Sequence, residues 1–181
     1  MLATKDGTEQ SLDLQRGIVI FDSRYGNTEK IAIAIAAGFK QGGLQTATCS
    51  NVKEITDMES LMEYDLIVVG GPTENHTASE SIKQFLARLE GLDLSRKFGF
   101  SFDTRYDFPI GTGSSAKVIE KKLKKLGLNI IFERSSAKVV EQKDKAGGVI
   151  LKGGEEKRFE DIGVRVATAF LTTKRKEMIQ A

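Results

Sequence analysis

Residues 17–31 read GIVIFDSRYGNTEKI, an apolar run that passes through a short polar loop into a helical pattern. The run 17–21 is continuously apolar, which is typical of a strand covered on both faces. After the loop, apolar residues from Ile31 to Gly38 recur at helical spacing, and the Gly-Gly pair at 42–43 is a signal for the end of a helix. A buried strand that leads directly into a helix is the first half of a βαβ unit.

The same alternation continues along the chain. Apolar and β-branched runs predict further strands at residues 46–49, 65–70, 98–102, 128–132, 137–140 and 149–151. Amphipathic periods predict helices between the longer runs, and Thr77 with Glu80 predicts the start of one of them as a capping box. Strands that alternate with helices indicate an α/β fold, in which parallel βαβ units form a doubly wound sheet.

Composition indicates one domain with no disulfide and no membrane segment. The chain has 181 residues, one cysteine, one histidine and a net charge of +2. A single cysteine and a single histidine exclude an intrachain disulfide and make a structural zinc site unexpected. The nearly balanced charge does not point to nucleic acid, and the apolar runs are far shorter than the ~20 residues of a membrane span. We expect a flexible leader over residues 1–15, a single domain over residues 16–176 and a cytoplasmic location.

The loop between the first strand and helix has the chemistry of an anion site. In doubly wound sheets, ligands bind beyond the carboxyl ends of the strands. Here backbone N–H groups at a helix N-terminus lie beside the hydroxyls of Ser23 and Thr28, and Gly26 allows close approach. The loop lacks the motifs of a P-loop and of a dinucleotide fold. A simpler alternative is that Ser23 and Asn27 only cap the helix.

Residues 19–35 resemble the flavodoxin signature, in which a strand ends in an aromatic residue and is followed by Ser or Thr, by Gly and Thr, and by a helix rich in Ala and aliphatic residues. The resemblance implies a three-layer α/β sandwich with a five-stranded parallel sheet in the order 2-1-3-4-5. It also implies that this loop holds the phosphate of flavin mononucleotide (FMN) without a metal. The implied phosphate-binding residues are Ser23, Arg24 (through its backbone N–H), Tyr25, Gly26, Asn27 and Thr28.

The same resemblance implies that two further loops clasp the isoalloxazine ring of FMN. The implied ring-binding residues are Pro72, Thr73, Glu74, Asn75 and His76 in the second loop, and Asp103, Thr104, Arg105 and Tyr106 in the third. Aromatic contact with a flat ring adds about 0.5–1.5 kcal/mol beyond burial, and Tyr106 is our first choice for it, ahead of Phe108 and Tyr25. The alternative is that Tyr106 packs only on its own loop.

Three of these loop residues leave alternatives open. His76 could contact the ring or be a solvated surface group. Arg105 could stabilise the reduced flavin, or it could form a surface ion pair with Asp103 or Asp107. Flavodoxins commonly carry a glycine in the second loop whose peptide reorients on reduction; here no glycine follows Gly71, and Asn75 is the residue that best tolerates a positive φ.

The resemblance implies electron transfer between redox partners, such as a ferredoxin or a reductase. The alternative is an NAD(P)H-dependent FMN or quinone reductase on the same fold, so whether the chain is itself an enzyme stays open. No catalytic residue and no metal ligand set is predicted. A row of lysines within residues 117–125 either favours an acidic partner or is simply a solvated face. A phosphoacceptor receiver domain is disfavoured, because the buried run ends in Val69-Gly70-Gly71 without the required aspartate.

Overall fold

The computed structural model describes residues 15–107, 112–144 and 147–180. The expected leader therefore lies outside the described residues except for Gln15, and so does Phe108. The last helix, α4, spans Glu155–Gln180 and extends past the expected domain end at residue 176. Among the described residues, no helix combines the length and apolar character needed to cross a lipid bilayer.

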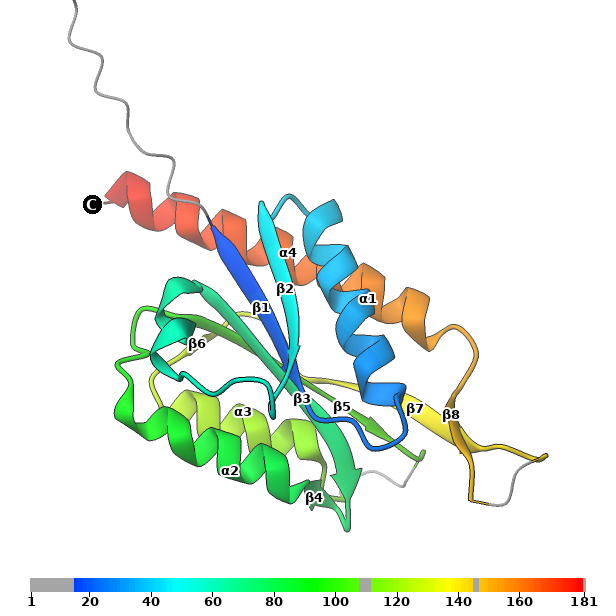
Figure 1. The fold of residues 1–181 in the computed structure, drawn as a ribbon. Coiled ribbons are helices and arrows are strands. Elements are labelled where there is room, and N and C mark those ends of the chain that lie inside the picture. Colours follow the sequence, from blue (N-terminus) through cyan, green and yellow to red (C-terminus); the bar gives the residue numbers. More distant parts are fainter. Residues whose placement is uncertain (1–14, 108–111, 145–146, 181) are drawn as a thin grey trace, which may run out of the picture.

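The centre of the molecule is a sheet whose long parallel strands have the predicted order. These strands are β1 (Arg16–Phe21), β2 (Thr46–Asn51), β3 (Leu66–Glu74), β5 (Phe98–Arg105) and β7 (Ser135–Glu141). They lie side by side as β2-β1-β3-β5-β7, which is the order 2-1-3-4-5 when these five are counted along the chain. The α/β class and this order are confirmed (Figure 1).

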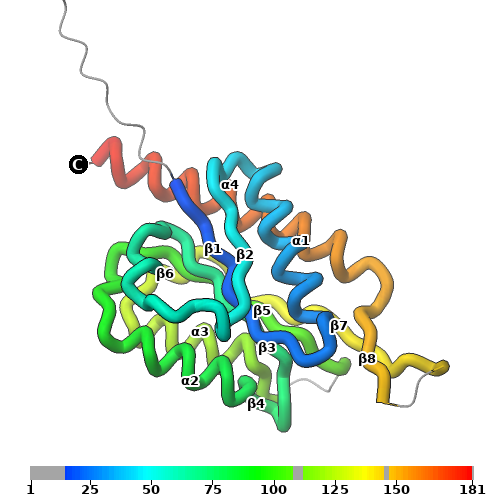
Figure 2. Tube along the Cα trace, in the orientation of Figure 1, coloured from blue at the N-terminus to red at the C-terminus, as the bar shows by residue number. Residues whose placement is uncertain are grey.

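The edges of the sheet differ from a plain five-stranded arrangement. The last parallel position is shared by two segments, because β6 (Asn129–Ile130) pairs with the beginning of β5 and β7 pairs with its end. Strand β8 (Val149–Leu151) then pairs with β7 in the antiparallel sense and extends the sheet by one more strand. Figure 2 shows this β7–β8 hairpin beside the beginning of α1.

Helices cover both faces of the sheet. Helices α1 (Asn27–Gln41) and α4 lie on one face, and α2 (Glu80–Arg88) and α3 (Ser115–Lys125) lie on the other (Figure 1). Short 3₁₀ turns at Glu59–Glu63 and Leu89–Gly91 connect these elements. The two helical layers produce two apolar clusters, one on each side of the fully buried strands β1 and β3, as the continuous apolar runs predict.

Helices α1 and α4 cross with their backbones in contact. A Cβ atom at Gly38 would lie 2.1 Å from the carbonyl oxygen of Glu160, and one at Gly163 would lie 2.4 Å from that of Ile35. Glycine at both positions therefore lets the helices approach closely. This packing fixes the position of α1, whose N-terminus opens at the carboxyl end of the sheet (Figure 1).

The predicted start of α2 is wrong. Strand β3 continues to Glu74 and pairs with β4 (Thr77–Ala78), so Thr77 belongs to a β-ladder and not to a capping box. Helix α2 begins instead after Ser79, whose side chain accepts a hydrogen bond from the N–H of Ile82. The pairing of β3 with β4 uses the backbone around Thr77, and this delays the helix by two residues.

Candidate functional site

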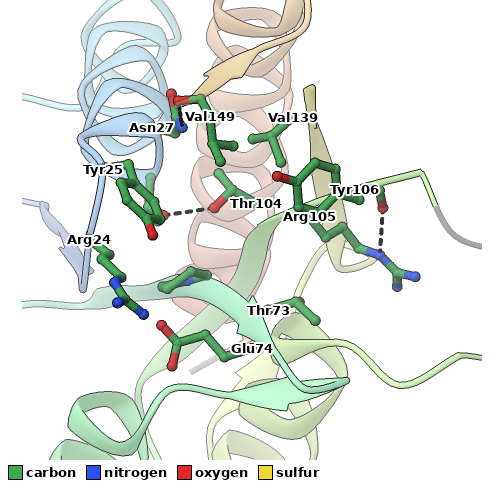
Figure 3. Close-up of a pocket in the computed structure, with 12 residues that line it drawn as sticks. Arg24, Tyr25, Asn27, Thr73, Glu74, Thr104, Arg105, Tyr106, Val139 and Val149 are labelled. Carbon is green, nitrogen blue, oxygen red and sulfur yellow. Dashed lines mark hydrogen bonds between the residues drawn. The ribbon is translucent and has the colours of Figure 1, made fainter. Parts of the chain in front are cut away.

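A cleft opens at the carboxyl end of the parallel strands, where the loop before α1, the β3–β4 hairpin, the end of β5 and the β7–β8 hairpin meet (Figure 3). Its empty volume is about 540 Å³ with the solvent at its mouth included. The residues that line it are Arg24, Tyr25, Asn27, Thr28, Pro72, Thr73, Glu74, Thr104, Arg105, Tyr106, Val139 and Val149.

The loop before α1 presents an open helix N-terminus to this cleft. Gly26 is the N-cap residue at φ +80°, a left-handed conformation that favours glycine, and none of the described side chains caps the helix. The first backbone hydrogen bond runs from the N–H of Lys30 to the carbonyl oxygen of Gly26, at 3.1 Å. The N–H groups of residues 27–29 therefore have no carbonyl partner within the helix, and they are the groups that bind anions at such termini.

The alternative that Ser23 or Asn27 caps α1 is contradicted. The side-chain amide of Asn27 donates to the carbonyl oxygen of Val149, at 2.9 Å. The hydroxyl oxygen of Ser23 is buried and has no hydrogen-bond partner among the described residues. A buried hydroxyl without a partner is uncommon in native proteins and fits a group that binds a ligand. The loop therefore supplies a free hydroxyl next to free amides.

Thr28 is buried at the base of the same loop and contacts the third predicted loop. Its Oγ1 lies 2.8 Å from Oγ1 of Thr104, and either hydroxyl can be the donor. Thr28 is 2% exposed and Thr104 is 5% exposed, and both line the cleft. The structure thus brings a residue implied to bind phosphate together with a residue implied to bind the ring.

The neighbouring Asp103 points to the other side of the sheet. Its Oδ2 accepts hydrogen bonds from Oγ1 of Thr73 at 2.8 Å and from the N–H of Ala116 at 3.0 Å. The Thr73 hydroxyl oxygen in turn accepts from the N–H of Ser115 at 2.9 Å. Asp103 is fully buried and does not line the cleft. Its carboxylate joins β3, β5 and the beginning of α3, so it positions the wall of the cleft.

Asp22, a buried carboxylate that was not predicted to have a role, also joins the end of a strand to the beginning of a helix. Oδ2 of Asp22 accepts a hydrogen bond from the Ser79 hydroxyl at 2.6 Å, and the Asp22 N–H donates to the carbonyl oxygen of Gly70. Asp22 follows β1 directly, and Ser79 is the N-cap of α2. An acidic residue directly after a buried strand, together with an N-cap serine, is the sequence signal that could have found this pair.

The second loop is a tight hairpin turn. Asn75 and His76 have φ of 46° and 62°, so both central residues of the turn are left-handed, as in a type I′ hairpin. The prediction of a positive φ at Asn75 is confirmed, and His76 shares it. The turn leaves Pro72, Thr73 and Glu74 on the wall of the cleft, whereas Asn75 and His76 are at the exposed tip and do not line it.

Two tyrosines border the cleft. Tyr25 is 57% exposed and Tyr106 is 36% exposed, and both rings are large apolar surfaces open to solvent. The guanidinium carbon of Arg24 lies 5.4 Å from the centre of the Tyr25 ring, which is a cation–π distance. Arg105 donates to the Thr112 hydroxyl at 2.6 Å and to the carbonyl oxygen of Tyr106 at 3.4 Å.

The rim beside Tyr106 is rich in cations. Nζ of Lys138 lies 2.8 Å from Oδ1 of Asp107. This hydrogen bond lowers the pKa of Asp107, and the charges of Lys138, Lys152 and Arg105 lower it further. Asp107 is therefore ionised at neutral pH, and the positive charges of Lys138, Lys152 and Arg105 all act on this one carboxylate.

The sequence suggests that the hairpin from Ala137 to Glu155 could contribute to a pocket, but it does not single out the residues of β7 and β8 that line the cleft. Val139 and Val149 line the cleft, and the carbonyl oxygen of Val149 holds Asn27. The predicted strands at 137–140 and 149–151 are confirmed. The position of this hairpin over the loop before α1, however, involves a contact between residues 122 positions apart in the sequence. The Gly-Gly pair at 147–148, between two apolar strands, was the only local signal of a hairpin.

The sequence profile of the flavodoxin family matches residues 19–160. The chain belongs to the flavodoxin family. A flavodoxin from Picosynechococcus sp. is 33% identical over 116 residues, which cover 60% of this chain and 64% of the relative. An NAD(P)H dehydrogenase (quinone) from Archaeoglobus fulgidus is 31% identical over 107 residues, which cover 46% of this chain and 56% of the relative.

Solved flavodoxin structures share the fold. A flavodoxin from the domain Archaea aligns with a TM-score of 0.67 and 19% identity, over 84% of this chain and 96% of that chain. At this identity the likeness concerns the fold alone. The two sequence relatives are longer than the region compared, since this chain spans only 56% and 64% of their lengths.

Proposed function

We propose that this flavodoxin-family chain binds FMN in the cleft and transfers electrons between redox proteins. The observation that carries the proposal is the buried Ser23 hydroxyl, which has no partner among the described residues and lies in the loop before the uncapped beginning of α1. Amides and a hydroxyl that have no partner among the described residues, in the loop that borders the cleft, form a receptor for an acceptor-rich anion. A phosphate monoester at the end of a flat aromatic cofactor has this chemistry.

The residues at the site form two groups, one that would bind the phosphate of FMN and one that would enclose its ring. The backbone N–H groups of the loop before α1 and the hydroxyls of Ser23 and Thr28 would bind the phosphate. Tyr106, Tyr25 and the wall formed by Pro72 and Thr73 would enclose the ring. When bound, FMN supplies the redox chemistry, because it can take up and release electrons; the protein supplies affinity, orientation and access.

The cationic rim favours an acidic redox partner such as a ferredoxin. The charges of Arg105, Lys138 and Lys152 act on Asp107, the residue after Tyr106, so positive charge exceeds negative charge in this group beside the cleft. In the row of lysines on α3, Lys122 and Lys124 are already in ion pairs with Glu90 and Glu120. Complementary charge steers the encounter of two proteins and raises the association rate. We place this exchange in the cytoplasm, where a single free cysteine remains reduced.

The absorption spectrum of the purified full chain tests cofactor binding. We expect a protein that is yellow as isolated or after incubation with FMN, and that keeps the flavin through desalting. Riboflavin, which lacks the phosphate, should bind more weakly than FMN. A chain that remains colourless after saturation with FMN, with a native circular-dichroism spectrum, would contradict the proposal.

The rim is tested by the ionic-strength dependence of electron transfer from a reduced, acidic ferredoxin. The rate should fall as salt is added, because the charges that steer the encounter are screened. Lys152→Glu should lower the rate at low salt. Lys40→Glu, at the far end of α1, is the matched control and should leave it nearly unchanged. Equal effects of the two variants would reject the rim as the docking surface.

A second candidate function is an NAD(P)H-dependent quinone reductase. It is favoured by the 31% identity to the quinone dehydrogenase of Archaeoglobus fulgidus. Addition of NADH or NADPH to the FMN-loaded chain, with no other protein present, separates the two functions. Rapid loss of the visible flavin absorbance supports the reductase, whereas a flavin that stays oxidised until a redox partner is added supports the carrier.

A further inference from the structure

We propose that Thr104 is a positioning residue for the phosphate of FMN, and that it acts through the hydroxyl of Thr28. The inference depends on the proposed function. The family resemblance implies a ring-binding role for the loop that contains Thr104. In the structure, however, the Thr104 hydroxyl lies 2.8 Å from that of Thr28, at the base of the loop before α1. Thr104 therefore reaches the phosphate end of the site.

The end of β5 delivers two polar side chains to opposite faces of the sheet. Successive residues of a strand point to opposite sides. Asp103 is bonded to Thr73 and to the beginning of α3 on one side, and Thr104 is bonded to Thr28, at the beginning of α1, on the other. Each residue thus meets the N-terminus of a different helix. Of the two, Thr104 lines the cleft and Asp103 does not, so Thr104 lies closer to a ligand bound there.

The two hydroxyls form a chain whose direction a bound anion fixes. A threonine hydroxyl has one hydrogen to donate and two lone pairs that accept. In the Thr28–Thr104 pair, one hydroxyl donates and the other keeps its hydrogen for a further acceptor. A dianionic phosphate only accepts hydrogen bonds, so a Thr28 hydroxyl that binds it must donate to it. Thr28 must then accept from Thr104, and Thr104 becomes the donor of the pair.

This arrangement strengthens the phosphate contact in two ways. The bond from Thr104 holds the Thr28 side chain in one orientation, so that less rotational freedom is lost when the ligand binds. A hydroxyl that accepts one hydrogen bond is also a better donor in the next, because bonds in a chain polarise one another. Thr28 and Thr104 are 2% and 5% exposed, so water competes little for either hydroxyl.

The experiment measures the affinities of FMN and riboflavin for the full chain. Because the protein contains no tryptophan whose fluorescence could report binding, the signal is the quenching of flavin fluorescence. Thr104→Val keeps the shape of the side chain and removes the hydroxyl; Thr104→Ser keeps the hydroxyl. We expect Thr104→Val to weaken FMN roughly 5- to 10-fold and to leave riboflavin within about twofold. Thr104→Ser should bind FMN nearly as well as the unmodified chain.

A double-mutant cycle tests whether Thr104 acts through Thr28. In a Thr28→Val background, Thr104→Val should have little further effect on FMN, because the link to the phosphate is already missing. The ³¹P chemical shift of bound FMN gives a readout that does not depend on affinity, and it should change in Thr104→Val but not in Thr104→Ser. If Thr104→Val does not fold, Thr104→Cys offers a similar volume with a much weaker donor and should show the same selective loss.

The outcomes separate this inference from the proposed function. If the unmodified chain binds no FMN, the proposed function fails. If it binds FMN and Thr104→Val weakens FMN and riboflavin equally, or weakens neither, only the role of Thr104 is rejected. Additive effects in the cycle would also reject it, because Thr104 would then act independently of Thr28. A selective loss of FMN that serine restores supports it.

Discussion

The side-chain amide of Asn27 donates a 2.9 Å hydrogen bond to the backbone carbonyl of Val149, and this bond joins the first turn of α1 to the edge strand β8. Asn27 is 6% exposed, so the bond is shielded from water. Strand β8 has three residues, and among the described strands it pairs only with β7. The bond from Asn27 is therefore an important restraint on the β7–β8 hairpin over the cleft.

Asn27→Leu should loosen the hairpin. Loss of one hydrogen bond to a partly buried carbonyl costs about 1 kcal/mol, and we expect the amides of residues 149–151 to exchange roughly fivefold faster. Hydrogen exchange of the full chain measures this directly. Asn129→Ala, at an exposed asparagine on the other end of the sheet, is the control. Unchanged exchange in the hairpin would show that packing of Val139 and Val149 alone holds it.

Cys49 should be a slow thiol despite its partial exposure. Burial raises the pKa of the Cys49 thiol to about 11, with smaller contributions from the charges of Glu29 and Glu54. The thiolate is the reactive form. At pH 8 the alkylation rate should therefore be roughly 100-fold below that of the unfolded chain, and it should still rise above pH 9. Glu54→Gln removes one of the charges that raise the pKa and should increase the rate modestly.

The pH profile of alkylation, followed by mass spectrometry, is the measurement. The raised pKa also determines how the free energy of unfolding changes with pH. Between pH 9 and pH 11 the unfolded chain releases the thiol proton and the folded chain retains it, so the free energy of unfolding should fall across this range. A rate that reaches its plateau near pH 9 would contradict the raised pKa.

The fold was predictable because its signals are local. The apolar runs of β1 and β3 are buried on both faces by helices, and their continuous apolar sequence alone predicts this burial. The start of α2 was not predictable in the same way. Its competitor was the pairing of Thr77 with Glu74 across a two-residue turn, and Asn75-His76 lacks the glycine that usually signals such a hairpin.

The site was predictable as a set of loops, but the direction of each side chain was not. Asp103 and Thr104 are adjacent and were assigned the same role, whereas the alternation of β5 sends them to different helices. Which of the two faces the cleft depends on the register of the strand, and a one-residue shift would exchange them. The contribution of Val149 depends on long-range pairing, so no local pattern could supply it.

The buried carboxylate of Asp103 should be important for stability. Asp103→Ala leaves the Thr73 hydroxyl and the Ala116 N–H without their acceptor, and we expect the free energy of unfolding to fall by about 2–4 kcal/mol. Chemical denaturation of the full chain measures it. Asp107→Ala removes an exposed ion pair with Lys138 and should change stability little. Similar losses in the two variants would show that the Asp103 network is not a structural centre.

Ser23 and Ser79 are expected to have different roles, Ser23 in ligand binding and Ser79 in stability. The Ser23 hydroxyl is buried with no partner among the described residues, whereas the Ser79 hydroxyl donates to Asp22 and accepts from the N–H of Ile82. Ser79→Ala should therefore lower the free energy of unfolding by about 1–2 kcal/mol. Ser23→Ala should leave the stability of the FMN-free chain unchanged or slightly higher, because it removes a buried polar group that makes no bond.

With FMN the contribution of Ser23 should become visible. Ser23→Ala should weaken FMN binding by roughly 10- to 150-fold, since a hydrogen bond to a charged group is worth about 1.5–3 kcal/mol, and it should leave riboflavin binding almost unaffected. Thermal unfolding with and without each flavin gives both quantities in one series. A large loss of stability in FMN-free Ser23→Ala would mean that the hydroxyl already has a partner in the protein. Its place in a phosphate site would then lose its main support, because a satisfied structural hydroxyl has no free hydrogen to offer.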